Sequence, residues 1–277
     1  MAAAIVAVDS VTTLVASHAG AVVVTGSHGG VIAARYALHA RVHAAVFNDA
    51  GIGLDDAGVA GLALLEEAGV ASCAVSHASA RIGDASDTLA CGIVSRMNTL
   101  ASADGVHAGM ACAEAAGRMA HAVRASVTTD VADIAYIAES RTLLQPPHDS
   151  LPAVVALDSI GLVRDDDAGA ILIIGSHGAL HGGDPASALP VDAQAAFFHD
   201  AGRGKEDAGT SRLPALDARG IAAATVDYRS AHIGDARSMW DRGVLSCVNA
   251  SLRRLGVAPG TSVRAAVERI ATKALRA

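Results

Sequence analysis

Short apolar runs alternate with amphipathic stretches along the first half of the chain. Each run is apolar over most of its length, which is typical of strands that are buried on both faces of a sheet. The runs are "AIVAV" (4–8), "AVVVT" (21–25), "HAAVF" (43–47) and "VASCAV" (70–75). The stretches between them predict helices, so we expect an α/β fold whose mostly parallel sheet carries helices on both faces.

Helix signals support this reading. The stretch "VIAARYALHAR" (31–41) has helical spacing, and "GVAGLALLEEAG" (58–69) ends on Gly69, which suits a C-cap. Asp56 is placed to cap that second helix. Residues 87–101 are expected to form another helix, for which Asp84 and Asp87 are the candidate caps.

The same elements then occur a second time. "FNDAGIGLDDAG" (47–58) recurs as "FHDAGRGKEDAG" (198–209), and "SARIGDA" (79–85) as "SAHIGDA" (230–236), both 151 residues later. "GSHG" recurs 149 residues after its first appearance, so the second copy has gained two residues just after this turn. This self-similarity predicts a tandem duplication whose units pack about a pseudo-twofold axis.

Three segments follow from the duplication. The first α/β unit spans residues 1–124 and the second spans 154–277. Residues 125–153 are expected to be a connector, a helix followed by a break at Pro146-Pro147.

Composition narrows the classes of function. Apolar residues make up 52% of the chain and charged residues 18%, which is enough apolar material for a core. The net charge of −7 argues against broad nucleic-acid binding. No apolar run is long enough to cross a membrane, and the start of the chain lacks a signal-peptide pattern. Four cysteines without CxxC spacing predict reduced thiols in a cytoplasmic protein.

Polar residues recur where the predicted strands end. Ligands of open α/β sheets bind beyond the carboxyl ends of the strands, so these positions predict a site. A serine can supply a nucleophile, a histidine can move the proton and an aspartate can orient the histidine. The candidates for catalysis are Ser27, His28 and Asp49, with Ser176, His177, Asp200 and Lys205. The alternative is that each serine caps a helix and each histidine bonds a neighbouring strand end.

A second group is expected to bind the ligand. Glycines allow sharp turns that bring N–H groups close to an anion, and arginine clamps carboxylates or phosphates. This group contains Gly26, Gly29, Gly30, Ser79, Arg81, Gly178, His199, Arg203 and Ser230. Lys205 is either a base whose pKa burial has changed or one half of an exposed ion pair with Glu206.

Three functions compete. The first is a hydrolase or lyase that acts on a small carbonyl compound (amide, lactam or ester) in a cleft between the two repeats. The second is a transferase or isomerase on a phosphorylated or nucleotide-like ligand, although GxGxxG after the first strand and Walker A motifs are absent. The third is a non-catalytic module that binds a small ligand. No metal motif is present, so we expect no metal and no cofactor, with a small molecule as partner and a homo-oligomer left open.

Overall fold

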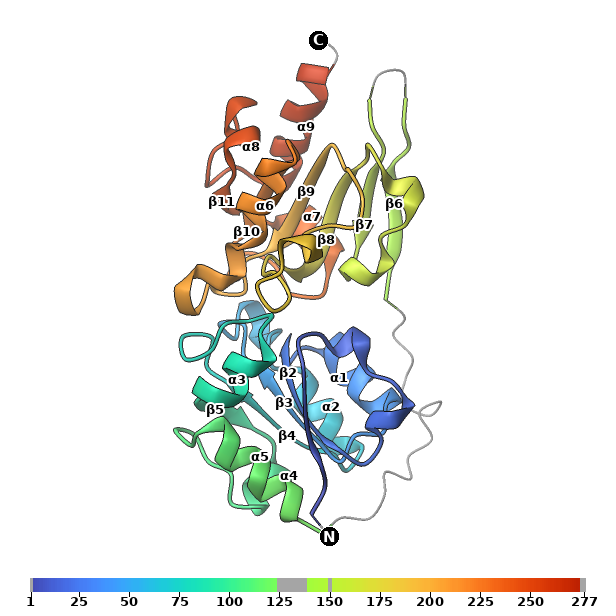
Figure 1. The fold of residues 1–277 in the computed structure, drawn as a ribbon. Helices are drawn as coiled ribbons and strands as arrows, with labels where there is room; N and C mark the ends of the chain where they lie inside the picture. The colour runs from blue at the N-terminus through green and yellow to red at the C-terminus, as the bar shows by residue number, and fades with distance from the viewer. Residues whose placement is uncertain (1, 124–138, 149–150, 275–277) are drawn as a thin grey trace. The chain divides into compact units, whose positions relative to one another are not determined.

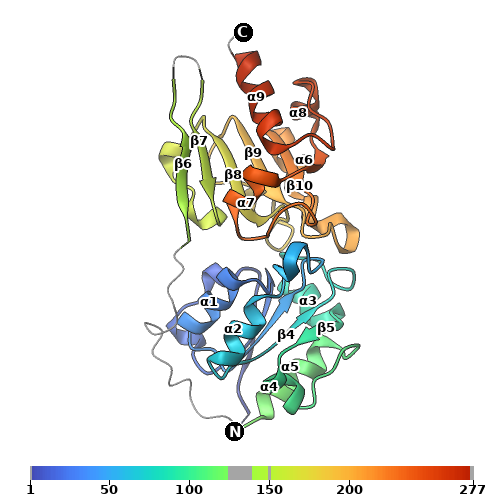
Figure 2. The same cartoon turned by 180° about the vertical axis from the view of Figure 1, so that it is seen from behind.

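The computed structural model describes residues 2–123, 139–148 and 151–274. The chain divides into two compact units (Figures 1 and 2). Unit 1 contains residues 1–138 together with the short segment 203–208, and unit 2 contains 139–202 and 209–277. Each unit has its own sheet and its own apolar core.

The sheet of unit 1 has five strands whose order in space follows the sequence. The first four are parallel, and the fifth runs antiparallel to the fourth. The strands are β1 (Ile5–Val8), β2 (Val22–His28), β3 (Ala44–Asn48), β4 (Ala71–Val75) and β5 (Val94–Met97).

Helices cover both faces of this sheet because successive strand residues point to opposite sides. Val23 packs toward α1 (Val31–His39) and α2 (Gly61–Glu67), whereas its neighbours Val22 and Val24 pack into the other layer. That opposite layer contains α3 (Ala85–Cys91), α4 (Thr99–Ala103) and α5 (Cys112–His121). Short 3₁₀ helices lie at Val11–Thr13, Ala16–His18 and Leu54–Asp56.

Unit 2 has a six-stranded sheet in the order β11-β10-β9-β8-β7-β6. The four central strands are parallel, and both outer strands are antiparallel to their neighbours. The strands are β6 (Arg141–Gln145), β7 (Val154–Leu157), β8 (Ile171–His177), β9 (Ala195–His199), β10 (Ala222–Val226) and β11 (Leu245–Val248).

The helices of unit 2 also form two layers. One face is covered by α6 (Arg212–Ala218) together with residues 188–193. The other face is covered by α7 (Ala236–Arg242), α8 (Ala250–Arg254) and α9 (Val263–Ala274). Short 3₁₀ helices lie at Ile160–Leu162, Asp165–Asp167, Pro185–Ser187 and Lys205–Thr210, the last of which spans the boundary of the two units.

The predicted α/β class with mostly parallel sheets and helices on both faces is confirmed, while the pseudo-twofold relation stays a prediction. The single helix expected over 87–101 is wrong. α3 ends at Cys91. A Cβ added at the next residue, Gly92, would lie 2.4 Å from the carbonyl oxygen of Thr88. The β-branched Ile93 and Val94 then lead into β5.

Two further expectations differ from the structure. Asp56 does not cap α2, whose N-cap is Ala60, and instead lies in the preceding 3₁₀ turn with φ 57°. Residues Arg141–Gln145, expected in the connector, form the edge strand β6. The helix expected at the start of the connector falls almost wholly on 124–138, outside the described residues.

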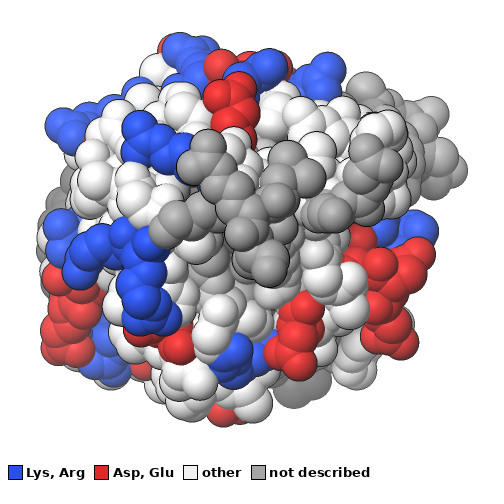
Figure 3. All heavy atoms as spheres, turned by 90° about the horizontal axis from the view of Figure 1, so that it is seen from above, with Lys and Arg blue, Asp and Glu red and all other residues white. Residues whose placement is uncertain are grey.

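The charged surface is mixed in sign where it can be seen. Figure 3 shows one face on which basic and acidic side chains are interspersed among uncharged residues. Among the described residues, no helix combines the length and the apolar character needed to span a bilayer.

Candidate functional site

The two Ser-His turns hold neighbouring loops in place. The Ser27 hydroxyl accepts a hydrogen bond from the Val11 N–H at 3.0 Å, and His28 Nδ1 accepts one from the Gly30 N–H at 3.0 Å. In unit 2, Ser176 accepts from Ile160 and His177 accepts from Ala179. These contacts match the alternative reading, in which the serines and histidines satisfy backbone groups at the starts of helices and loops.

The glycines of these turns allow the backbone to approach itself closely. A Cβ on Gly26 would lie 2.5 Å from the Asp84 nitrogen, and one on Gly29 would lie 3.1 Å from the Gly58 oxygen. At Gly30 the nearest atom would be His28 Nδ1 at 2.7 Å. At Gly178 it would be the Gly209 oxygen at 2.5 Å. Close approach within the chain therefore accounts for these glycines without a ligand.

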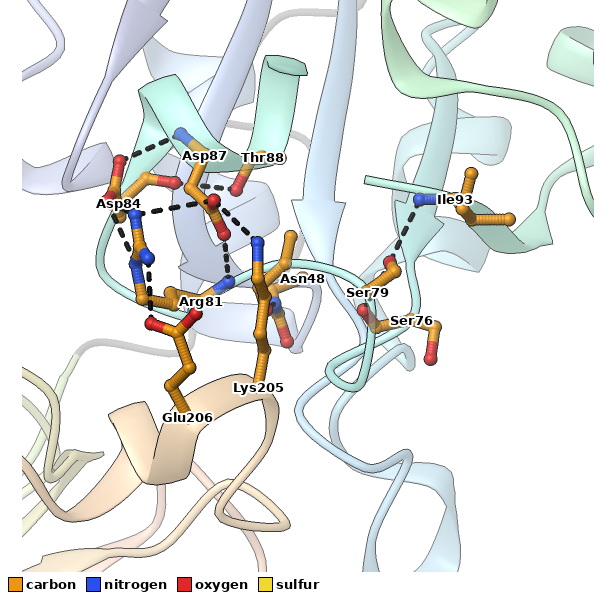
Figure 4. A network of polar contacts seen from close by, with 11 residues as sticks. Asn48, Ser76, Ser79, Arg81, Asp84, Asp87, Thr88, Ile93, Lys205 and Glu206 are labelled. Atoms are coloured by element: carbon orange, nitrogen blue, oxygen red, sulfur yellow. Dashed lines mark hydrogen bonds and ion pairs between the residues drawn. The ribbon is translucent and has the colours of Figure 1, made fainter. Parts of the chain in front are cut away.

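The serines of the SAxIGDA motif have the same structural role in both units. Ser79 donates to the Ser76 carbonyl at 2.7 Å and accepts from the Ile93 N–H at 2.9 Å (Figure 4). Ser230 donates to Asp227 and accepts from Val244. Each hydroxyl thus joins the turn after one strand to the start of the next.

Asp49 lies at the carboxyl end of β3 and binds His77, a histidine that is not among the candidates expected from the sequence. Its Oδ1 is 2.9 Å from Nδ1 of His77 and also accepts the His77 backbone N–H at 2.9 Å. Ser95 donates to Oδ2 at 2.7 Å. Asp49 therefore orients His77, and the expected pairing of Asp49 with His28 is replaced by this contact.

The exposure of this pair is uneven. The Asp49 side chain is 4% exposed, whereas that of His77 is 29% exposed. Burial opposes ionisation of Asp49, but hydrogen bonds from His77, Ser95 and Gly51 outweigh burial and lower the pKa of this carboxyl. Asp49 is thus a fixed carboxylate beneath a partly exposed imidazole.

The equivalent aspartate of unit 2 lacks this imidazole. Asp200 accepts backbone N–H groups from Gly202 and Tyr228, and Tyr228 stands where unit 1 has His77. Asp200 also has a hydrogen bond with Ser246. Burial raises the pKa of Asp200 by more than these three hydrogen bonds lower it. Among the described residues, Asp200 therefore has no counterpart of the contact between Asp49 and His77.

A network of charged side chains joins Arg81, Asp84 and Asp87 to Lys205 and Glu206 (Figure 4), all of them in unit 1, which includes residues 203–208. Lys205 Nζ is 2.8 Å from Asp87 Oδ1, and the Lys205 backbone N–H donates to the His77 carbonyl at 2.8 Å. Arg81 bonds Asp84 and, at 2.9 Å, Glu206. Lys205 thus forms its ion pair with Asp87, whereas the alternative expected from the sequence was an ion pair with Glu206.

The hydrogen bonds and ion pairs of this network favour the charged forms of Lys205, Arg81 and Asp87. The hydrogen bond to Asp87 raises the pKa of Lys205, which is the opposite of what a lysine needs to act as a base. Glu206 and Asp84 raise the pKa of Arg81. Burial disfavours the charged form of Asp87, but Lys205 and Arg81 outweigh it and lower its pKa. These cations are neutralised by carboxylates of the chain itself.

The other two predicted ligand-binding residues are held by internal contacts. His199 is buried, its Nε2 lies 3.1 Å from the Ala231 carbonyl, and its Nδ1 accepts the Ala201 N–H. Arg203 has φ 62° and pairs with Asp207 at 2.9 Å.

Sequence comparison between the copies could have identified His77. His77 is not among the residues that both copies share, because Tyr228 stands at the equivalent position. The signal is a titratable residue that follows a strand in one copy only.

Comparisons with protein-family models, with curated proteins and with solved structures find no match. Among the described residues, no group of three or more His, Cys, Asp or Glu side chains is arranged to hold a metal ion.

Proposed function

We propose that the protein is an enzyme that uses His77 for general acid–base catalysis, and that it hydrolyses a small carbonyl compound such as an amide, lactam or ester. The observation that carries this proposal is the 2.9 Å contact between Asp49 Oδ1 and Nδ1 of a partly exposed His77. A buried carboxylate that accepts from Nδ1–H fixes the tautomer and leaves Nε2 as the basic nitrogen.

The chemistry then follows from the two groups. His77 Nε2 takes a proton from water while the water oxygen attacks the carbonyl carbon, and the imidazolium later returns the proton to the leaving nitrogen or oxygen. Asp49 stabilises the imidazolium, and Ser95 holds the second carboxylate oxygen in place. Water as the nucleophile suits the observed contacts of Ser27, which accepts a backbone N–H and lies 4% exposed.

The test measures hydrolysis of small p-nitrophenyl esters, p-nitroanilides and lactams by the wild-type chain and two variants. His77→Gln and Asp49→Asn are each expected to lower kcat/KM by about 10²-fold or more, the usual range for a lost general base or its orienting group. His107→Gln is the control because His107 is an exposed histidine whose Nδ1 contacts only the neighbouring Ala108 carbonyl in the described contacts.

A second measurement does not need a substrate. Imidazole ¹H–¹⁵N spectra should show His77 as the Nδ1–H tautomer in the wild type and a changed tautomer balance in Asp49→Asn. Full activity of His77→Gln against a substrate that the wild type hydrolyses would overturn the proposal. If the wild type and both variants bind one of the tested esters, anilides or lactams with equal affinity and none of them hydrolyses it, the result would favour the ligand-binding module.

A further inference from the structure

Unit 2 contains a buried arginine that has no carboxylate partner among the described residues. Arg212 begins α6 and is 0% exposed. Its Nη1 donates to the carbonyls of Ser187 and Ala188, and its Cζ lies 5.3 Å from the centre of the Phe198 ring. Arg141 of the same unit shows the usual solution, an ion pair with Asp167 at 2.6 Å. In the part of the chain that the structure describes, the positive charge of Arg212 has no such counter-ion.

The guanidinium has one edge that the chain leaves poorly satisfied. Nε is buried and has no hydrogen-bond partner among the described residues. The contact described for Nη2, which shares that edge, is a long one of 3.4 Å to Nε2 of His181. The Nε–Nη2 edge presents two parallel N–H groups, the geometry that receives two oxygens of a carboxylate or phosphate.

The sequence places this arginine where the two copies differ. Arg212 stands at the position of Gly61 in unit 1, and both residues donate their backbone N–H to the matching glycine, Gly178 or Gly29. In unit 1 an added Cβ at Gly61 would meet Ala34 of α1 at 2.7 Å. In unit 2 the segment that replaces α1 contains the two extra residues and a 3₁₀ turn, and Arg212 lies against it.

We propose that the Nε–Nη2 edge of Arg212 binds a small oxyanion, with His181 beside it. Taking a guanidinium out of water is costly unless a counter-charge accompanies it, and a bound carboxylate or phosphate supplies that charge. Burial lowers the pKa of Arg212 to about 9, which reflects the same uncompensated charge.

Entry requires the covering segment to move. Residues 182–186 are exposed, so their side chains bury little surface against the rest of unit 2. Gly182 and Gly183 both have positive φ, a backbone conformation that glycine adopts readily. The segment is held by the His181 N–H to the Ser187 hydroxyl and by the Leu180 N–H to the Ser211 hydroxyl, both at 2.9 Å. The site involves neither Asp49 nor His77, so its failure would leave the proposed function untouched.

The first test follows the Arg212 Nε–H resonance of the labelled wild-type chain. Sodium formate, acetate and phosphate are added separately at constant ionic strength, so that planar carboxylates and tetrahedral phosphate are distinguished. The resonance should shift and saturate with at least one anion. If the resonance shifts with none of the three anions, the proposal is overturned. Arg212 would then have a structural role, in which its hydrogen bonds hold residues 180–188 in place.

The second test uses thermal melting with a matched control. The preferred anion should raise the Tm of the wild type by about 5 °C or more at a hundredfold excess over Kd. Arg229→Met should respond equally, because Arg229 is an exposed arginine that pairs with Asp227. Arg212→Met should not respond, and an equal response would contradict the proposal. If Arg212→Met fails to fold, Arg212→Lys keeps the charge without the fork and should bind the anion at least tenfold more weakly.

Discussion

His199 and Asn48 occupy equivalent positions and make the same two hydrogen bonds. Asn48 donates to the Ala80 carbonyl and accepts the Ala50 N–H, while His199 contacts the Ala231 carbonyl and accepts the Ala201 N–H. Both ring nitrogens of His199 are therefore used in the neutral form, in which Nε2 carries the proton. The imidazole acts here as an amide would, which explains why a histidine at a strand end need not be catalytic.

The buried His199, which stands where unit 1 has Asn48, predicts that the stability of the protein depends on pH. Burial lowers the pKa of His199 from its ordinary 6.5 to about 4, so the unfolded chain binds the proton more readily between these values. The free energy of unfolding should therefore fall as the pH drops from about 6.5 to 4, by up to about 3 kcal/mol from this group. The His199→Asn variant should not show the part of this decrease in the free energy of unfolding that comes from His199. Urea unfolding of both proteins at pH 7, 5.5 and 4.5 checks this, and parallel pH profiles would contradict it.

At the scale of elements, Gly26 marks where β2 meets the turn before α3. A Cβ added there would lie within 2.8 Å of three backbone atoms, in Asp84, Gly83 and Asp9. Backbone atoms cannot rotate away as a side chain can, so Gly26→Ala should destabilise the protein by about 2 kcal/mol or more. Gly117→Ala in α5 is the control, because nothing lies within 4 Å of its Cβ and alanine should stabilise that helix by up to about 1 kcal/mol. Urea midpoints that are equal for the two variants would rule out the close-approach explanation.

The parallel elements could be predicted from the sequence, and the reasons for the failures are physical. Buried parallel strands are apolar without interruption, so β2, β3 and β4 are visible as runs. β5 was missed because it has only four residues, of which Arg96 is exposed, and it returns antiparallel after a Gly92 break. The Asp49–His77 contact joins residues 28 positions apart, and no local pattern reports which histidine an aspartate meets in space. The strand-end location of the aspartate was predictable, but its partner was not.

At the scale of the whole molecule, the two units share strand-end residues that make matching contacts. Asp49 and Asp200 receive matching backbone donors, from Gly51 and His77 in one unit and from Gly202 and Tyr228 in the other. Each also receives a serine hydroxyl. The repeated residues maintain the strand-end loops, whereas the proposed chemistry depends on unrepeated ones, His77 in unit 1 and Arg212 in unit 2. Function in a duplicated chain is therefore better sought where the copies differ.

This conclusion predicts that the missing imidazole can be restored. In Tyr228→His a new ring can donate to Asp200 as His77 does to Asp49, because the backbone at both positions already bonds the carboxylate. The hydrogen bond favours the ionised carboxyl, so the pKa of Asp200, which burial now raises, should fall. The nearby charge of Asp227, where unit 1 has Ser76, will limit the decrease. Carboxyl ¹³C titration measures the change, with the reciprocal variant His77→Tyr expected to raise the pKa of Asp49. If Asp200 titrates unchanged in a folded Tyr228→His protein, the ring contact does not explain the difference between the two aspartates, and the assignment of catalysis to unit 1 loses its electrostatic basis.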